Sequence, residues 1–238
     1  MKTLLFSLLL TISGLTTLEA QINENPILNL ENEDKKRLNW GYYLGFNQYD
    51  FKVDYKYHDY STWYMADQML TSKSLGFNVG LIGELRLNDY LDVRLEPGLY
   101  YNQRDVGFKN LLDNSSKIVP VKSTYIHIPL LLKVSTKRLG NIKPYVVGGV
   151  ATSFNLSSNN GNTQNITNGV LSMRKSNYYW EVGFGIDFYL RYFKFSPSIR
   201  GSFAFQDEIT LDKAGDDPFL GNVKATYSRA IFVNFTFE

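Results

Sequence analysis

Few residues in this chain could take part in catalysis, and two histidines are the first of them. His58 lies in a polar stretch, whereas His127 stands between Ile126 and Ile128 where apolar and polar residues alternate. A hydrolase or acyltransferase site would need such a histidine beside a hydroxyl and an acid. The alternation places His127 on the polar face of its segment, so we predict a structural role for it.

Carboxylates could supply acid and base groups, but their neighbours favour ion pairing. Glu84 and Glu96 each lie two residues from an arginine on the same face, Arg86 and Arg94 respectively. An acidic stretch late in the chain matches no calcium-loop spacing, which favours a solvated loop. Its acids are Asp207, Glu208, Asp212, Asp216 and Asp217.

Composition excludes several other classes of chemistry. The chain has no cysteine, so it carries neither a disulfide nor a thiolate metal site. Its glycines do not form a phosphate-binding loop, and a net charge of +2 is too small to indicate nucleic acid. We therefore predict no enzymatic activity, no cofactor and no small-molecule substrate.

Apolar residues alternate with polar ones along most of the chain, which is typical of β-strands with two different faces. Even positions are apolar from Tyr178 to Phe188, and the phase then inverts, so that odd positions are apolar from Phe193 to Phe205. The segment after residue 142 is ambiguous, and Pro129 predicts a bulge or locally broken pairing. The predicted strands cover about 39–50, 74–87, 91–104, 121–136, 143–155, 178–188, 193–205 and 224–237.

The connections alternate between short and long. The inverted phase around Leu190-Arg191 predicts a two-residue loop flanked by the facing pair Tyr189 and Tyr192. Short turns on the periplasmic side and long loops outside are the usual asymmetry of outer-membrane barrels. The short connections are about 88–90, 137–142 and 190–191, and the long ones are about 51–73, 105–120, 156–175 and 207–223.

These segments predict an all-β, antiparallel, eight-stranded transmembrane β-barrel in the cell outer membrane. A soluble two-sheet sandwich is the rival fold, because it could also bury the aromatic rows. Its strands are usually ~5–6 residues long, shorter than these segments. A lipocalin-like barrel would expose those rows to water.

The beginning of the chain has the features of a signal peptide. Lys2 precedes an apolar run from Leu4 to Ile12, which is too short to span ~30 Å of hydrocarbon as a helix. Cleavage before Gln21 is therefore favoured over a membrane anchor. We expect a signal peptide at 1–20, a solvated periplasmic tail at 21–38 and the transmembrane barrel at 39–238.

Charged residues on the polar faces would meet inside the barrel. A lumen of this strand number is only wide enough for side chains to fill it, so we predict an ion-paired plug, with a small gated pore or proton path as the alternative. The predicted network consists of Glu84, Arg86, Asp92, Arg94, Glu96, Lys133, Glu181, Asp187, Lys194 and Arg200.

The first long loop is rich in aromatic residues. Exposed aromatics of this kind can anchor a partner, or they can fold the loop over the barrel mouth. The candidate docking residues are Tyr55, Tyr57, Tyr60, Trp63 and Tyr64.

Several segments taken together resemble the PorT (SprT) family. They are DKKRLNWGYYLGFNQYDF, GFNVGLIGELRLNDYLDVRLEPGLYYNQR, STYIHIPLLLKVSTKRLGNIKPYVVGG, YYWEVGFGIDFYLRYFKFSPSIRG and the closing IFVNFTF. The segments YIHIPLLLK and GFGIDFYL belong to a broader superfamily of barrels and indicate the fold alone. The combination with NWGYYLGFNQYDF and RLEPG indicates the secretion branch.

The resemblance implies an outer-membrane barrel of the Bacteroidota type IX secretion system, associated with gliding motility where that occurs. The implied role is non-enzymatic assistance in exporting proteins with C-terminal sorting domains. The implied partners are outer-membrane lipid and other secretion components. Two readings remain beside it, a generic adhesin or envelope stabiliser and a lipid-modifying barrel enzyme.

Overall fold

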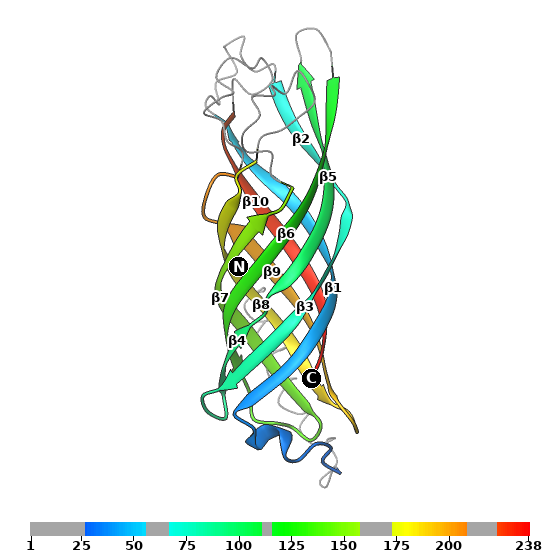
Figure 1. The fold of residues 1–238 in the computed structure, drawn as a ribbon, viewed down its shortest axis with the longest axis vertical. Coiled ribbons are helices and arrows are strands. Elements are labelled where there is room, and N and C mark those ends of the chain that lie inside the picture. Colours follow the sequence, from blue (N-terminus) through cyan, green and yellow to red (C-terminus); the bar gives the residue numbers. More distant parts are fainter. Residues whose placement is uncertain (1–26, 56–66, 111–115, 158–172, 209–222) are drawn as a thin grey trace, which may run out of the picture.

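The computed structural model describes residues 27–55, 67–110, 116–157, 173–208 and 223–238. These residues form a tall antiparallel barrel, preceded by the short 3-10 turn η2 (Glu33–Lys35) (Figure 1). Within the described ranges, no helix has the length and apolar character needed to cross a membrane. The strands are β1 (Leu38–Tyr55), β2 (Asp67–Lys73), β3 (Leu75–Arg86), β4 (Leu91–Leu95), β5 (Gly98–Asn110), β6 (Ser116–Ser135), β7 (Ile142–Asn155), β8 (Ser176–Tyr189), β9 (Lys194–Ala204) and β10 (Val223–Phe237).

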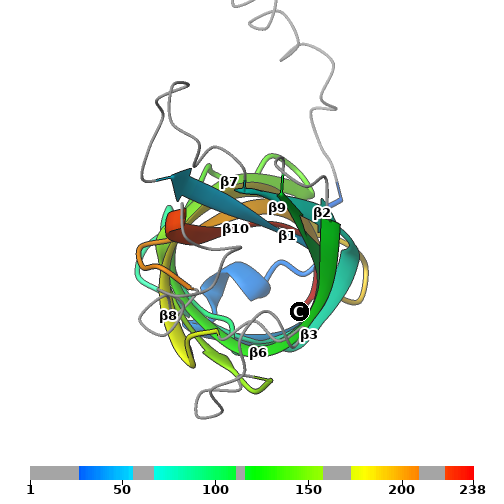
Figure 2. The same cartoon turned by 90° about the horizontal axis from the view of Figure 1, so that it is seen from above.

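Strand pairing runs around the sheet and returns to its first strand. β1 pairs with β10 on one side and with β3 on the other. From β10 the order continues through β9, β8 and β7 to β6, which pairs with β4 and β5, and these pair with β3. Seen from above, the strands form a ring (Figure 2). The predicted antiparallel barrel is therefore confirmed.

The predicted strand at 91–104 is divided into β4 and β5, and a further strand, β2, lies in the segment predicted as the loop 51–73. β2 and β3 are separated at Ser74, where the pairing with β5 shifts by one residue: Phe77 pairs with Tyr101, but Lys73 pairs with Arg104. This one-residue irregularity interrupts the ladder without changing the direction of the chain. β2 and β3 thus act as one wall strand.

Two prolines explain the division of the predicted strand 91–104 into β4 and β5. Pro97 and Glu96 separate these strands, and Pro129 of β6 lies opposite. Pro129 has no N–H to donate, and the Glu96 N–H donates to the Pro129 carbonyl oxygen at 3.2 Å. The predicted break in pairing is confirmed on this side of Pro129, whereas its other side keeps a regular register opposite Ala151 of β7.

Side chains alternate between the lumen and the outer wall, as the sequence predicts. On β8, Tyr179 and Glu181 are buried, whereas Val182 and Phe184 are 49% and 59% exposed. The facing of β7, which the sequence left ambiguous, is clear in the structure. Odd positions of β7, such as Lys143, point into the lumen. The apolar rows therefore form the outside of the barrel, which is the arrangement that lipid requires.

The turns at one end are short, and we name this the turn end. The loop at 88–90 is confirmed, because the Leu87 N–H donates to the Leu91 carbonyl oxygen at 3.0 Å. The predicted facing pair of Tyr189 and Tyr192 is wrong, because the turn lies one residue later in the chain than predicted. Tyr189 pairs with Lys194 inside the barrel, and the loop residues are 191 and 192, leaving Tyr192 84% exposed.

At the opposite end, the loop end, the strands are longer than predicted. β1 continues to Tyr55, β5 continues to Asn110, and β6 begins at Ser116. The predicted loops at 51–73 and 105–120 are therefore shorter than expected. Hydrogen bonding between strands does not require an apolar face, so pairing extends beyond the alternating pattern that the sequence shows.

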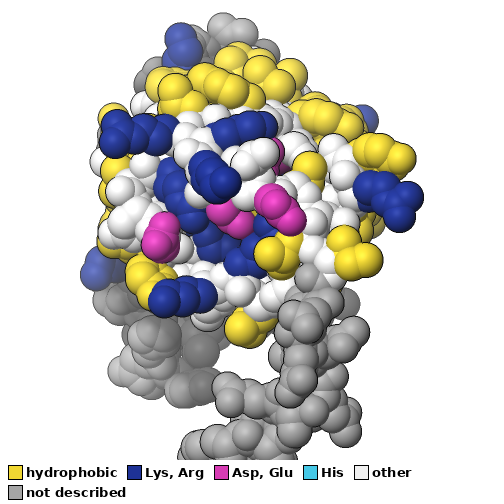
Figure 3. Space-filling model, turned by 90° about the horizontal axis from the view of Figure 1, so that it is seen from below, with side chains coloured by type: hydrophobic (Ala, Val, Ile, Leu, Met, Phe, Trp, Pro, Cys, Tyr) yellow, Lys and Arg dark blue, Asp and Glu magenta, His cyan; other side chains and the backbone are white. Residues whose placement is uncertain are grey.

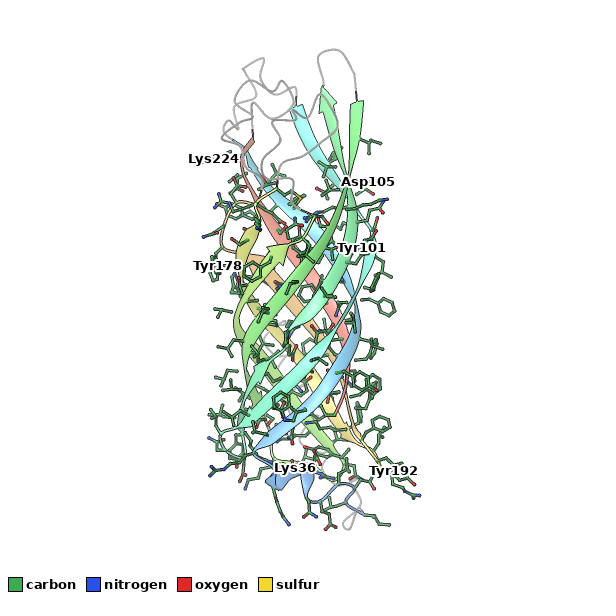
Figure 4. The ribbon with its side chains drawn as sticks, in the orientation of Figure 1. Lys36, Tyr101, Asp105, Tyr178, Tyr192 and Lys224 are labelled. Carbon is green, nitrogen blue, oxygen red and sulfur yellow. The ribbon has the colours of Figure 1, made fainter. Side chains whose placement is uncertain are left out.

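Aromatic side chains gather at two heights on the outer wall, as is typical of girdles at the two membrane surfaces. Near the turn end, Tyr42 stacks on Phe237 with ring centroids 5.3 Å apart. Nearer the loop end, Trp180 stacks on Phe203 at 4.4 Å. Tyr101 and Tyr178 project outward at this upper level, while Tyr192 lies at the base (Figure 4).

Candidate functional site

The lumen near the turn end contains an ion-paired group that we name the basal cluster. Glu84 accepts hydrogen bonds from Arg94 Nε at 2.7 Å and from Lys133 Nζ at 3.2 Å. Lys133 Nζ also donates to Asp187 at 2.7 Å. Five strands and the residue that follows β10 contribute to it, so it ties opposite sides of the barrel together. The basal cluster consists of Glu84, Arg94, Lys133, Asp187, Lys194 and Glu238.

Glu238 completes the basal cluster from the end of β10. Its carboxylate pairs with Arg94 Nη2 at 2.6 Å and with Lys194 Nζ. The backbone N–H of Glu238 also donates to the Lys194 carbonyl oxygen at 3.0 Å. Sequence reasoning missed this role, although Glu238 continues the inward phase of Asn234 and Thr236.

A second group, the central cluster, lies above the basal one. Arg200 pairs with Glu96 at 2.7 Å and with Glu181 at 3.0 Å. His127 Nε2 lies 2.6 Å from Glu181 Oε1, and Arg94 links the two clusters by its 3.4 Å contact with Glu96. His127 is 1% exposed and points into the lumen, as the sequence predicts.

Above the central cluster, aromatic rings fill the bore. Tyr43 donates a hydrogen bond to the Glu96 carbonyl oxygen at 3.2 Å and lies 3.1 Å from the Tyr100 hydroxyl. Phe232 packs edge-on against Tyr100, with centroids 5.1 Å apart. We name this group the aromatic layer. It consists of Tyr43, Tyr49, Ile82, Tyr100, Tyr125, Ala230 and Phe232, all no more than 4% exposed.

A last buried pair lies above the aromatic layer. Glu208 accepts a hydrogen bond from the Tyr125 hydroxyl at 2.5 Å, pairs with Arg104 at 3.4 Å and accepts another from Ser228. The prediction of a solvated acidic loop is therefore wrong for Glu208, which has 0% exposure. Its backbone N–H donates to the Thr226 carbonyl oxygen, which extends the sheet past β9.

Eight of the ten predicted network residues join the two clusters, and two lie apart. Arg86 is half-buried at the turn end, where it pairs with Asp34 at 3.6 Å and Asp89 at 3.9 Å. Asp92 is buried near Lys143, a residue that the sequence did not assign to either face of the barrel. Among the aromatic loop candidates, Tyr55 ends β1, and Tyr57, Tyr60, Trp63 and Tyr64 lie outside the described residues, as does His58.

The segment before β1 lies across the turn end of the bore, and we name residues 27–37 the cover. Seen from above, it crosses the ring (Figure 2). Asn29 Nδ2 donates to the Tyr189 carbonyl oxygen at 3.0 Å, and Asn141 Nδ2 donates to the Ile27 carbonyl oxygen at 2.9 Å. Arg138 donates to the carbonyl oxygens of Asn29 and Leu30.

Asp34 anchors the cover, so the expectation that its charge is merely solvated is wrong. Tyr189 donates to Asp34 at 2.8 Å, and Arg138 donates at 3.1 Å. Partial burial disfavours its charged form, but these two hydrogen bonds and the positive charges of Lys143 and Arg138 outweigh that effect. The pKa of Asp34 is therefore lowered from its ordinary value.

Little free space remains between the cover and the basal cluster. The polar void there has a volume of ≈ 10 Å³. It is lined by residues of the cover, such as Asp34, and by residues of the basal cluster, such as Lys133. That is room for about one water molecule. Viewed from below, charged side chains lie within a rim of apolar ones (Figure 3). No group of three or more His, Asp or Glu residues in the described ranges could hold a metal.

Solved structures with a similar fold are small outer-membrane barrels. OprG from Pseudomonas aeruginosa matches with a TM-score of 0.50 and 16% identity, covering 83% of this chain and 94% of OprG. Neisserial surface protein A matches with a TM-score of 0.40 and 13% identity, covering 82% and 95%. At such identities the likeness to OprG concerns the fold alone. No curated protein sequence matches the chain.

A family model settles what kind of protein this is. The model described as outer membrane protein beta-barrel domain matches residues 19–210, which is more than half of the chain. The apolar outer wall, the aromatic girdles and the closed strand pairing agree with it. The chain therefore belongs to the outer membrane protein β-barrel domain family and is a small barrel of the outer membrane.

Proposed function

We propose that this barrel is a closed scaffold that passes no solute and presents its two ends to other components of the cell envelope. The observation that carries the proposal is the filled bore. The basal cluster, the central cluster and the aromatic layer follow one another along the lumen. The charges of the two clusters lie in ion pairs, so each offsets the charge of its neighbour within the bore.

Conductance tests this proposal directly. The full barrel, inserted in a planar phosphatidylcholine bilayer, should show no current steps above the bare membrane at either polarity. An open barrel that conducts ions under the same conditions provides the comparison. Reproducible single-channel steps from the unaltered protein would contradict a closed scaffold and would support the gated-pore alternative.

The scaffold's biological task is the finer part of the proposal. We propose that it assists type IX secretion, because the segments from DKKRLNWGYYLGFNQYDF to IFVNFTF resemble the PorT family over nearly the whole mature chain. A bore this narrow favours an assisting role beside a larger pore over a transport role of its own. Other secretion components would bind its loops, its turns or the cover.

Deleting the chain in its native host tests that task. A cargo protein with a C-terminal sorting domain should accumulate unprocessed in the cells, and a restored copy should return it to the surface. Gliding, where the host glides, should fail together with export. If the cargo reaches the surface at the wild-type rate, the secretion role is wrong, whatever the conductance result is.

A generic role as an adhesin or envelope stabiliser is the second candidate. Membership of the outer membrane protein β-barrel domain family is consistent with it, because a fold family by itself does not specify a task. Normal secretion combined with increased detergent sensitivity of the deletion strain would identify a stabiliser. Weaker attachment to host cells would identify an adhesin.

A lipid-modifying enzyme is the least favoured reading. Such a site needs a histidine near the lipid surface with a hydroxyl beside it. His127 instead lies in the lumen against Glu181, with 1% exposure. Unchanged lipid A after expression of the protein would agree with this placement, and an altered acylation pattern would contradict it.

A further inference from the structure

The ladder that joins β1 to β3 ends below the tops of the strands. Its last pair is Gln48 with Leu75. Above this pair β1 continues along β10 and β2 continues along β5, but no described pairing joins β1 to β2. The two strands diverge there in the side view and in the view from above (Figure 1, Figure 2). We name this gap, between residues 49–55 and residues 67–73, the seam.

The β1 side of the seam is a strand edge without a neighbouring strand among the described residues. N–H groups point alternately to the two sides of a strand, so those of Phe51 and Val53 share one direction. The Phe51 N–H donates to Asp50 Oδ1 at 2.9 Å and not to a strand. At the base of the seam, Lys73 of β2 pairs with Asp50 at 2.9 Å. Side chains thus take over where the ladder ends, and such an edge readily accepts another strand.

The seam lies above the part of the wall that faces lipid. Tyr101 and Tyr178 mark the upper aromatic level, and both Asp105 and Lys224 lie above it (Figure 4). Asp105 pairs with Ser72 of β2, and Lys224 belongs to the top of β10, which pairs with the top of β1. Unpaired backbone groups are costly in hydrocarbon, whereas water solvates them above it. Since the long loops of such barrels face outward, the seam is accessible from outside the cell.

The β1 edge is fixed in place and carries an alternating charge pattern. Phe51 faces the lumen, where Arg104 Cζ lies 3.8 Å from its ring centroid. Asp50, Lys52 and Asp54 form the opposite row and remain partly exposed. Acid, base and acid therefore follow one another at every second residue. An antiparallel strand with base, acid and base in the same spacing would place each charge opposite its complement.

We propose that the seam binds one extended strand of a protein partner outside the cell, which pairs antiparallel with β1 and carries base, acid and base on its outward face. The inference rests on the scaffold role of the loop end and specifies the kind of partner. Backbone hydrogen bonds at Phe51 and Val53 provide affinity, and the charges select the sequence. A second copy in the same membrane fits less well. The two-fold axis that pairs identical antiparallel strands lies across them, so it would invert the second barrel.

Peptide binding tests the proposal on the full chain in phosphatidylcholine nanodiscs. The probe is the blocked, dye-labelled peptide TKVEVKT, whose charges would lie opposite Asp54, Lys52 and Asp50 in turn. Fluorescence anisotropy should show saturable binding. The charge-reversed TEVKVET should bind roughly ten-fold more weakly, because like charges then face each other. A TKVEVKT peptide methylated on both valine nitrogens should not bind, since its donors toward β1 are blocked.

A charge exchange locates the peptide on β1. Lys52→Glu, an exposed change, should reverse the preference, so that TKVKVKT binds more tightly than TKVEVKT. The matched control is Lys122→Glu, the same change at an exposed position of β6. This control should keep the preference of the unaltered protein for TKVEVKT, because its altered charge lies away from the seam.

Four outcomes would overturn the proposal. TKVEVKT might as well be absent from the edge if no saturable binding occurs at millimolar concentration. Equal binding of the methylated peptide would reduce the effect to charge attraction, and an unchanged preference in Lys52→Glu would place the peptide elsewhere. Nanodiscs that pair at their loop ends in electron micrographs, and that the peptide does not separate, would assign the edge to a second copy. None of these results alters the conductance or secretion tests, so the scaffold proposal can fail or stand separately.

Discussion

At the scale of single residues, the interior of this barrel depends on charges that are buried in pairs. Lys133 is the clearest example, since its ammonium group lies between Glu84 and Asp187 and is 1% exposed. Leaving such buried carboxylates without this cation is costly, because part of their negative charge then stays uncompensated in the lumen. The same logic explains why Glu238 adds to the basal cluster from the end of the last strand.

Lys133→Met is therefore expected to destabilise the folded barrel strongly. Removing one partner of a buried pair costs roughly 3–5 kcal/mol, because the remaining carboxylates lose part of their compensating positive charge. Urea unfolding in lipid vesicles, followed by tryptophan fluorescence, measures this loss. Lys137→Met, at an exposed turn position, is the control and should change the unfolding free energy by less than about 0.5 kcal/mol. Equal stability of the two variants would contradict the proposed plug.

The ring of Tyr43 requires a glycine beneath it. A Cβ added at Gly98 would lie 2.1 Å from the Tyr43 hydroxyl oxygen and 2.8 Å from the Val79 carbonyl oxygen. Gly98→Ala should cost about 1–3 kcal/mol through overpacking. Tyr43→Phe removes the closest atom, so the double variant should lose less than the sum of the two single changes. Strict additivity in urea unfolding would show that the clash with the hydroxyl is not the cause.

At the scale of elements, the cover differs from the strands because side-chain hydrogen bonds hold much of it. Asp34 accepts hydrogen bonds from Tyr189 and Arg138. Among the described residues, a single backbone hydrogen bond joins the cover to a strand, from the Arg86 N–H to the Arg37 carbonyl oxygen. Docking of such an element depends on the ionisation of Asp34, whereas the backbone hydrogen bonds between paired strands do not titrate. Docking of the cover should therefore be sensitive to acid.

The cover should detach at low pH. The pKa of Asp34 is lowered from its ordinary value of 3.8 by Tyr189 and Arg138, which outweigh its partial burial. A lowered carboxyl pKa stabilises docking above the ordinary value, and that stabilisation is lost as the pH falls through the lowered one. Since the chain has no cysteine, spin labels at Glu31→Cys and Tyr192→Cys report the distance specifically.

That distance should be narrowly distributed at about pH 7 and should broaden as the pH falls well below 3.8, the ordinary pKa of an aspartate. Asp34→Asn should broaden it at neutral pH, because the amide lacks the charge that Arg138 pairs with. Circular dichroism provides the control, since the strands should keep their signal at both pH values. A narrow distribution that persists in acid and in Asp34→Asn would show that Asp34 does not hold the cover.

At the scale of the whole molecule, several layers seal the bore independently. The cover closes the turn end, the two clusters follow, and the aromatic layer lies above them. Removing any single layer leaves the others in place. The closed state therefore belongs to the barrel itself and not to the cover.

Deleting residues 27–37 should consequently leave the planar-bilayer conductance at the level of the bare membrane. The charge clusters and the aromatic layer remain, so no water path forms. Adding Tyr100→Ala and Phe232→Ala to that deletion removes two fully buried rings and should raise the current. Conductance from the deletion alone would assign the seal to the cover instead.

The sequence by itself determined the wall of this protein. Its alternation assigned the outward rows, the turn at 88–90 and the inward face of residues such as Glu181 and Arg200, because the two faces of a strand meet different solvents. It also placed His127 in the lumen. Where the phase is weak, as along β7, the same signal left Lys143 unassigned.

Only the tertiary structure decided which charges meet. Arg200 and Glu96 are far apart in sequence, and Arg86 turned out to pair with Asp34 of the cover instead of joining the lumen clusters. Glu208 likewise looked like a loop residue until the closed sheet placed Arg104 beside it. Local pattern encodes the face on which a side chain lies, whereas its partner depends on the register and closure of all the strands together.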